Sequence, residues 1–203
     1  MEASWKILGV QSIDQFTMRG LAKELNIQAP TIYWYFDNKQ LLFQALANNV
    51  ARDIIPQLPS EGTWSEQLLQ SAWTIRRKLK QFACSAQLLM KTIPESDFKQ
   101  LINCLLRMIE PTPLSAKQKI SYTYHVFNFV VNFAVDEYER SALASLMDSQ
   151  ENKLSKDLSD SPLFQQYEDQ NFYIDSEQLF ESGIQLLLIG IECKVNETIQ
   201  DKE

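Results

Sequence analysis

Residues 17–39 constrain the fold of this chain most, because they predict two short helices joined by a tight turn. Thr17 is a hydroxyl residue at an N-cap position, and apolar residues then recur at helical spacing over 18–25. Asn26 ends this first helix, since asparagine tolerates the left-handed backbone that a tight helix stop requires. We expect the next residue, Ile27, to enter the core and fill the turn.

The second helix is predicted to start at once, with Ala29 and Pro30 in its first turn, and to continue over 31–36. Proline is tolerated there because the N–H group that it lacks has no partner in a first helical turn. Ile32 and Phe36 lie four residues apart and therefore share one buried face. The opposite face presents three consecutive aromatic residues, 33–35, and exposed aromatics at this density indicate a binding partner.

A short helix presented by a second helix that crosses it is the geometry that enters the DNA major groove. Early residues of such a helix contact base edges, while hydroxyl and basic side chains contact phosphates. The alternative is a three-helix module whose aromatics pack against a neighbouring element. The predicted DNA-binding residues are Thr17, Met18, Arg19, Gln28, Ala29, Pro30, Thr31, Tyr33, Trp34, Tyr35 and Lys39.

The signature TMRGLAKEL, a four-residue turn and APTIYWYFDNKQLLFQAL together resemble the DNA-binding domain of the tetracycline repressor (TetR) family. The likeness covers residues 5–47, and the layout of the remaining chain is similar to the tetracycline repressor subfamily. This resemblance implies an all-α protein with a three-helix helix-turn-helix domain (1–48) and a helical ligand-binding and dimerisation domain (49–203). It further implies a homodimeric, ligand-responsive transcriptional regulator, most often a repressor, on a palindromic operator in double-stranded DNA.

Charge and length at the N-terminus depart from this pattern. The net charge of −7 argues against indiscriminate coating of nucleic acid, but residues 1–48 are themselves neutral, with four basic and four acidic residues. Only 3–8 precede the bend at Gly9, so the first helix is expected to be truncated and to lack phosphate contacts. These features support an alternative function, a helical ligand-binding or protein-docking dimer with impaired DNA binding.

Helical periodicity continues through the rest of the chain, in which glycine is scarce and no sustained strand-like alternation occurs. The last two predicted helices are apolar on nearly every side, and Gly183 and Gly190 allow a neighbouring helix to approach closely. Such helices need covering on every side, which predicts a four-helix bundle across a two-fold axis; a buried monomer core is the alternative. The expected helices are a linking helix at 39–55 that ends at Pro56, then 64–82, 85–92, 96–109, 115–147 and 176–194, with a polar segment at 148–161.

The resemblance places a small-molecule ligand among the helices of the second domain. The tetracycline repressor holds drug and magnesium at positions that align with Ile55, Ser71, Leu89, Asn128 and Asp136, and only Asp136 keeps acidic character. We therefore expect a largely apolar inducer rather than a tetracycline chelate, although ordinary core is the alternative for each lining position. The predicted ligand-binding residues are Ser71, Ile75, Leu79, Phe82, Leu89, Leu101, Leu105, Phe127 and Asn128.

Catalytic and metal chemistry has little support in the sequence. His125 is the only histidine, so no histidine-based triad or His/Cys metal set can be assembled, and no glycine-rich phosphate loop is present. We expect no enzyme, no cofactor and no metal site. The basic residues at 76–80 are predicted to form a solvated face that pairs with acidic surface elsewhere, and a second DNA contact is the alternative. The acidic residues at 136–139 are predicted to be a helix terminus that faces solvent, and a metal site is the alternative.

The cysteines and the hydropathy bear on location. Cys84, Cys104 and Cys193 form no CxxC motif and have apolar neighbours, so we expect reduced, buried thiols in a cytoplasmic protein. The longest apolar run, 186–191, is too short for a membrane span.

Overall fold

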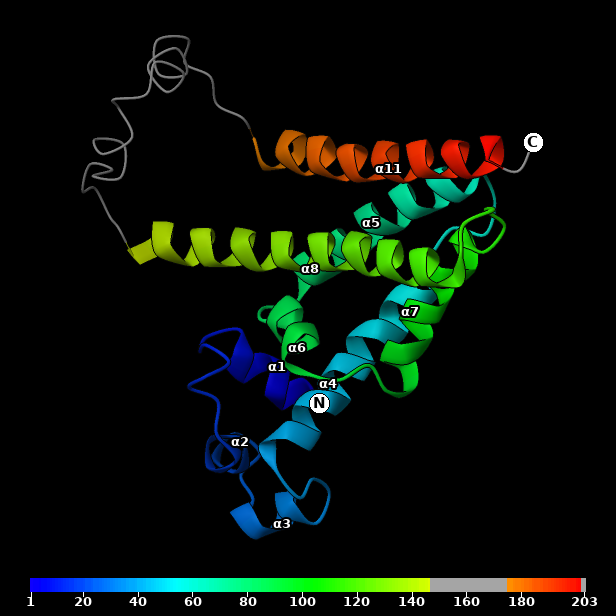
Figure 1. The fold of residues 1–203 in the computed structure, drawn as a ribbon. Coiled ribbons are helices and arrows are strands. Elements are labelled where there is room, and N and C mark those ends of the chain that lie inside the picture. Colours follow the sequence, from blue (N-terminus) through cyan, green and yellow to red (C-terminus); the bar gives the residue numbers. More distant parts are fainter. Residues whose placement is uncertain (147–174, 202–203) are drawn as a thin grey trace, which may run out of the picture.

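The computed structural model describes residues 1–146 and 175–201, and the polar segment predicted at 148–161 lies outside them. Within the described ranges every regular element is a helix, which confirms the all-α prediction. Figure 1 shows a small head, formed by α1 to α3, connected by the diagonal α4 to a larger helical body. The long helices α8 and α11 run antiparallel along the side of the body that is remote from the head.

The head consists of α1 (Glu2–Leu8), α2 (Met18–Glu24) and α3 (Ala29–Tyr33). Its core includes Leu8, Ile13 and Phe16, which are almost completely buried. At the start of α2 the Gly20 N–H donates to the Thr17 hydroxyl oxygen at 3.0 Å, so Thr17 is the predicted N-cap.

The turn between α2 and α3 corrects one prediction. Asn26 adopts the expected left-handed backbone, with φ of 53°, and the Ile27 N–H donates to the Ala22 carbonyl at 3.0 Å. The Ile27 side chain is nevertheless exposed, as is that of Leu25. The backbone hydrogen bond already closes the helix end, so the turn needs no hydrophobic plug.

The second helix of the head begins where it was predicted but ends earlier. It spans five residues, starting at Ala29 with Pro30 in its first turn, and Trp34 and Tyr35 lie beyond its end. Ile32 is buried and Phe36 is half-buried, so the predicted inward face is confirmed. The start agrees with the proline, whose fixed φ favours the first helical turn.

The linking helix α4 (Lys39–Ile54) is shared by the two cores of the molecule. Leu42, Phe43 and Leu46 lie in the core of the head, whereas 47–54 contributes to the core of the body. The Asn38 side chain accepts from the Leu41 N–H at 2.9 Å and so caps α4 at the end near α3. A 3₁₀ turn, η1 (Ile55–Gln57), follows and contains the expected proline.

The body is built from α5 (Trp64–Gln81), α6 (Ser85–Lys91), α7 (Ser96–Ile109), α8 (Ala116–Leu146) and α11 (Ser176–Gln200). Thr63 and Glu66 form a reciprocal capping box at the start of α5. Helix α6 packs against the head, because Leu88 and the N-cap residue Cys84 belong to the head core. The body therefore contacts the head through α6 as well as through α4.

Helices α8 and α11 approach each other closely at Gly183. A Cβ atom built there would lie 2.5 Å from Phe129 Cζ, so the predicted role of this glycine is confirmed. A Cβ at Gly190 would meet no atom within 4 Å, so Gly190 serves no close contact within this chain. Leu186 and Ile189 are exposed beside it and give α11 an apolar outer face.

Three further expectations concern the described residues only. All cysteines are free, but Cys84 alone is buried; Cys104 is half-buried and Cys193 is exposed, which corrects that prediction. Within the described ranges no helix has the length and apolar character needed to cross a membrane. Nor do the histidine, cysteine and carboxylate side chains of these ranges gather into a group of three that could hold a metal ion.

Candidate DNA interface and ligand cavity

The aromatic residues after the buried face of α3 form the most exposed apolar surface of the head. Trp34 is 84% exposed and Tyr35 is 78% exposed, and Tyr33 is also exposed. Gln28 and Pro30 are exposed beside them, while 29 and 31 are half-buried. The structure thus brings the predicted residues of the second helix onto one surface, at the tip of the molecule (Figure 1).

The start of α2 lies behind this surface and contributes differently from the prediction. Thr17 and Arg19 are exposed, but Met18 is only 6% exposed and packs in the core of the head. The Met18 side chain is therefore turned away from solvent, and the exposed groups at this end of α2 are the side chains of Thr17 and Arg19. The methionine is inward because it is the first residue of the buried face that continues with Leu21 and Ala22.

Lys39 holds the head together in addition to supplying charge. Its ammonium donates to the Ile13 carbonyl at 3.1 Å and lies 5.0 Å from the centre of the Phe43 ring. The side chain is half-buried, so one face of the ammonium remains open to solvent. A phosphate contact at Lys39 would thus be built on a side chain that is already positioned.

A second basic residue reaches the head from α6. Lys91 donates to the Asp14 carboxylate at 2.7 Å, and this hydrogen bond together with the lysine charge lowers the pKa of Asp14. Sequence reasoning counted the head as residues 1–48 and so missed this cation. Only the position of α6 against the head reveals it.

The predicted ligand-binding residues are divided between the core of the body and its surface. Ser71 is buried and donates to the Met108 sulfur at 3.4 Å, whereas Asn128 is exposed on α8, as is Asn132. A ligand contact at Asn128 stays a prediction, on a side chain that lies at the surface of the chain. The remaining predicted positions that pack in the core of the body are Ile75, Leu79, Leu89, Leu101, Leu105 and Phe127.

A cavity of about 600 Å³ lies at the end of the body where α5 ends and α11 begins. Leu79 and Phe82 are the predicted residues that line it. Its other walls come from the second half of α8, at 133–141, and from the first turn of α11 at Ser176 and Leu179. A cavity of this volume suits a small organic ligand.

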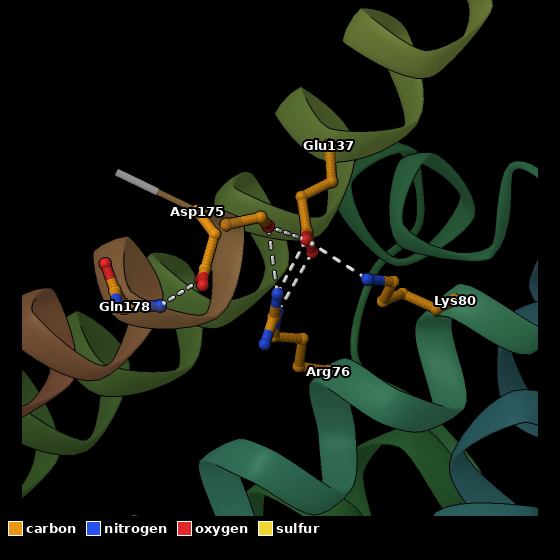
Figure 2. A network of polar contacts seen from close by, with 6 residues as sticks. Arg76, Lys80, Glu137, Asp175 and Gln178 are labelled. Atoms are coloured by element: carbon orange, nitrogen blue, oxygen red, sulfur yellow. Dashed lines mark hydrogen bonds and ion pairs between the residues drawn. The ribbon is translucent and has the colours of Figure 1, made fainter. Parts of the chain in front are cut away.

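A buried arginine forms the polar side of this end of the body, as Figure 2 shows. Arg76 is 2% exposed, and its guanidinium makes a two-pronged contact with the Glu137 carboxylate at 2.6 and 3.0 Å. The Ser176 hydroxyl also donates to Glu137, and the Lys80 ammonium lies 3.2 Å from it. Burial alone would raise the pKa of Glu137, but these hydrogen bonds and the charge of Arg76 lower it.

Aromatic rings complete the environment of the Arg76 guanidinium. Its central carbon lies 4.7 Å from the ring centre of Phe180, 5.1 Å from Trp73 and 5.4 Å from Phe133. Arginine stacks on aromatic faces and is less strongly hydrated than lysine, so it tolerates this burial. The predicted pairing of the basic residues at 76–80 with acidic residues elsewhere is therefore confirmed for Arg76 and Lys80, but the prediction of solvation is wrong for Arg76 and Glu137, which neutralise each other inside the body.

Cys84 joins this end of the body to the head. It has a left-handed backbone, with φ of 62°, in the tight turn between α5 and α6. Its sulfur lies 3.8 Å from the Leu8 carbonyl of the head and 3.5 Å from the hydroxyl of Tyr138, a residue that lines the cavity. Burial raises the pKa of the Cys84 thiol, and the contact with this sulfur raises the pKa of Tyr138 to about 12, so both groups are neutral.

Comparison with known proteins agrees with this architecture. The family model described as bacterial regulatory proteins, tetR family, matches residues 1–46, and the tetracyclin repressor-like C-terminal domain matches residues 55–195. The class D tetracycline repressor protein of Escherichia coli is 26% identical over 202 residues, which are 98% of this chain and 90% of the relative.

Solved structures show the same fold. A possible TetR family transcriptional regulator from Streptomyces coelicolor A3(2) has a TM-score of 0.79 at 22% identity, covering 95% of this chain and 96% of that one. BioQ with its natural double-stranded DNA operator has a TM-score of 0.63 at 28% identity, covering 70% of this chain and 85% of that one. The chain therefore belongs to the tetR family of bacterial regulatory proteins.

Proposed function

We propose that this protein is a ligand-responsive transcriptional regulator, acting as a repressor that binds a palindromic operator as a homodimer and leaves it when a small molecule binds. The observation that carries the proposal is the aromatic surface around α3, where Trp34 and Tyr35 are more than three-quarters exposed at the tip of a helix-turn-helix. The inward residues of α3, such as Ile32, anchor this surface in the core of the head.

The relatives support this function. The similar protein from Escherichia coli is a tetracycline repressor, and BioQ is similar over 70% of this chain in a structure that holds its DNA operator. Membership of a family of bacterial regulatory proteins supports a regulator that needs no catalytic step or cofactor. A partner such as operator DNA supports a cytoplasmic location.

The exposed apolar face of α11 supports the homodimer. Leu186 and Ile189 are 69% and 56% exposed on a helix that packs against α8 with its other face. Pairing α8 and α11 with their copies would cover this face in a four-helix bundle. The two heads would then contact half-sites about one helical turn apart, roughly 34 Å.

Selection of bound sites from random duplex DNA at moderate salt tests the proposal. We expect enrichment of a palindrome, and the selected site should then bind with an affinity that falls steeply as salt concentration rises, because phosphate contacts release counterions. Enrichment of no sequence would refute specific DNA binding and favour a ligand-binding helical dimer whose head no longer binds DNA.

Variants of the head make this test specific. Tyr33→Ala and Trp34→Ala should each weaken operator binding at least tenfold, with no change in the dimer mass measured by light scattering. Val10→Ala is the matched control, since Val10 is exposed in the head but lies outside α2 and α3. Equal effects of the three substitutions would contradict the placement of the DNA interface on α3.

A further inference from the structure

The cavity at the junction of α5, α8 and α11 has the walls of a site for an amphipathic molecule. Leu79, Phe82, Phe133 and Leu179 provide an apolar lining from three different helices. A volume of about 600 Å³ exceeds that of a single buried water many times and suits a molecule with roughly eight to twelve carbon atoms. The cavity therefore selects for an apolar body.

Two cations share one carboxylate at this end of the body, as far as the described residues show. Glu137 accepts two hydrogen bonds from Arg76 and also pairs with Lys80, whose ammonium lies 3.2 Å from one of its oxygens. The second pair on the cavity wall, Arg140 and Asp136, is matched one to one at 2.8 Å. In these two clusters of described residues, three cations therefore share two carboxylates.

The carboxylate at the start of α11 points along its own helix. Asp175 accepts a hydrogen bond from the Gln178 N–H of its own helix at 2.8 Å and is directed along α11 (Figure 2). The first turn of α11 meanwhile reaches the cavity at Ser176 with the positive end of its helix dipole. The Lys80 ammonium, half-exposed on the rim, is the group most available to an incoming anion.

One wall residue of the cavity connects it to the head. The Tyr138 hydroxyl contacts the sulfur of Cys84 at 3.5 Å, and that sulfur lies 3.8 and 4.0 Å from the carbonyl oxygens of Leu8 and Gln11. The contacts lead from Tyr138, on the cavity wall, through the side chain of Cys84 to Leu8 of α1. Cys84 cannot move independently, because it is buried in the core of the head and its left-handed backbone is fixed by the turn before α6.

We propose that this cavity is the inducer site, that it takes a molecule with an apolar body and a single carboxylate that pairs with Lys80, and that Tyr138 transmits its occupancy to the head through Cys84. Only the second part of this proposal, the transmission to the head, rests on the proposed regulatory function; ligand binding at the cavity does not. Binding at the cavity is measured without DNA, so failure of the site and failure of the regulator are distinguishable.

The ligand class is tested with three probes of one chain length but different charge: octanoate, octan-1-ol and octylammonium. Isothermal titration calorimetry on the full chain should give the tightest binding for octanoate and the weakest for octylammonium. Lys80→Gln should weaken octanoate about fivefold and leave octan-1-ol unchanged, since one charge-assisted contact is lost. Lys78→Gln, on the same helix but not lining the cavity, is the control and should change neither affinity.

Two results would overturn the site. Octanoate that binds no more tightly than octan-1-ol would refute the anionic class, and an octanoate affinity that Lys80→Gln leaves unchanged would place its binding elsewhere. Lys80 is half-exposed, so its replacement does not threaten folding, and the circular dichroism of each variant confirms this.

The coupling is tested on the operator obtained by selection. Saturating octanoate should weaken the binding of the wild-type protein to this duplex at least tenfold. The Tyr138→Phe variant should bind octanoate as tightly as the wild type but lose most of this effect on DNA binding. Phenylalanine retains the ring on the cavity wall and removes only the hydroxyl that contacts Cys84. Release that is equal in wild type and Tyr138→Phe would overturn the coupling, and so would tight octanoate binding that leaves operator affinity unchanged in both.

Discussion

Replacing Glu137 by glutamine should destabilise the protein far more than any single surface substitution nearby. The substitution preserves the size of the side chain but removes the negative charge that Arg76 needs. Arg76 is 2% exposed and is surrounded by aromatic rings, so water cannot replace the lost carboxylate. An unpaired buried guanidinium is the expected result.

The magnitude follows from the burial of the pair. The side chains of Arg76 and Glu137 are 2% and 12% exposed and meet at 2.6 Å. Removing one partner of a buried ion pair costs about 3–5 kcal/mol, because it leaves an uncompensated charge. For a chain of this length, that loss lowers the melting temperature by roughly 10 °C.

The adjacent residue supplies a matched control. Asp136 also pairs with an arginine of α8, Arg140, at 2.8 Å, but the two side chains are 52% and 69% exposed. Asp136→Asn should therefore cost only about 0–1 kcal/mol. Thermal unfolding followed by circular dichroism compares the two variants. Both are measured at one protein concentration, because the melting temperature of a dimer depends on concentration. A Glu137→Gln melting temperature within 2 °C of Asp136→Asn would refute the assignment of Arg76 as a buried charge that depends on Glu137.

Further predictions concern pH, helix packing and capping. The folded-state pKa of Glu137 is depressed, so its stabilisation is full above the ordinary value of 4.5 and is lost as pH falls through the lowered pKa. Urea titrations should accordingly show the wild-type advantage over Glu137→Gln shrinking below about pH 4.5, and a constant advantage would contradict this. Gly183→Ala should lower the free energy of unfolding by about 1–3 kcal/mol, because its Cβ would collide with Phe129. Gly190→Ala should leave the monomer unstrained. Equal losses of stability in urea unfolding would argue against the α8–α11 contact. Thr17→Ala should cost about 1 kcal/mol through loss of the α2 cap, and an unchanged urea midpoint would show that the cap is dispensable.

The head was the most predictable part of the fold from sequence. Its helices are short and their ends carry local signals, such as the Thr17 cap and the left-handed Asn26, that act within three or four residues. The apolar spacing identified Ile32 as inward, and the adjacent aromatics as outward, without reference to any other element. Local patterns failed for the end of α3, which comes before Trp34, and for Ile27 and Met18, where the direction of the side chain depends on how α2 packs against the rest of the head.

The ligand region was much less predictable, because it depends on contacts between residues far apart in the chain. Arg76 and Glu137 are 61 positions apart, and each alone looks like a charged surface residue. Only their pairing makes burial favourable, and no local pattern encodes it. The exposure of Asn128 was unpredictable for a related reason, since a helix that is apolar almost all round gives no signal of which side faces the body.

The packing of α6 changes what must move when the regulator releases DNA. Helix α6 is shared between the two cores: Cys84 and Leu88 are part of the head core and Lys91 pairs with Asp14 of the head at 2.7 Å, whereas Ala86 and Leu89 pack in the core of the body. A rotation of the head must therefore occur across the contacts that α4 and α6 make with the body, rather than across a flexible linker. The Tyr138 hydroxyl contacts Cys84 from the body side of that boundary. A molecule in the adjacent cavity consequently acts where a small displacement changes the orientation of the whole head.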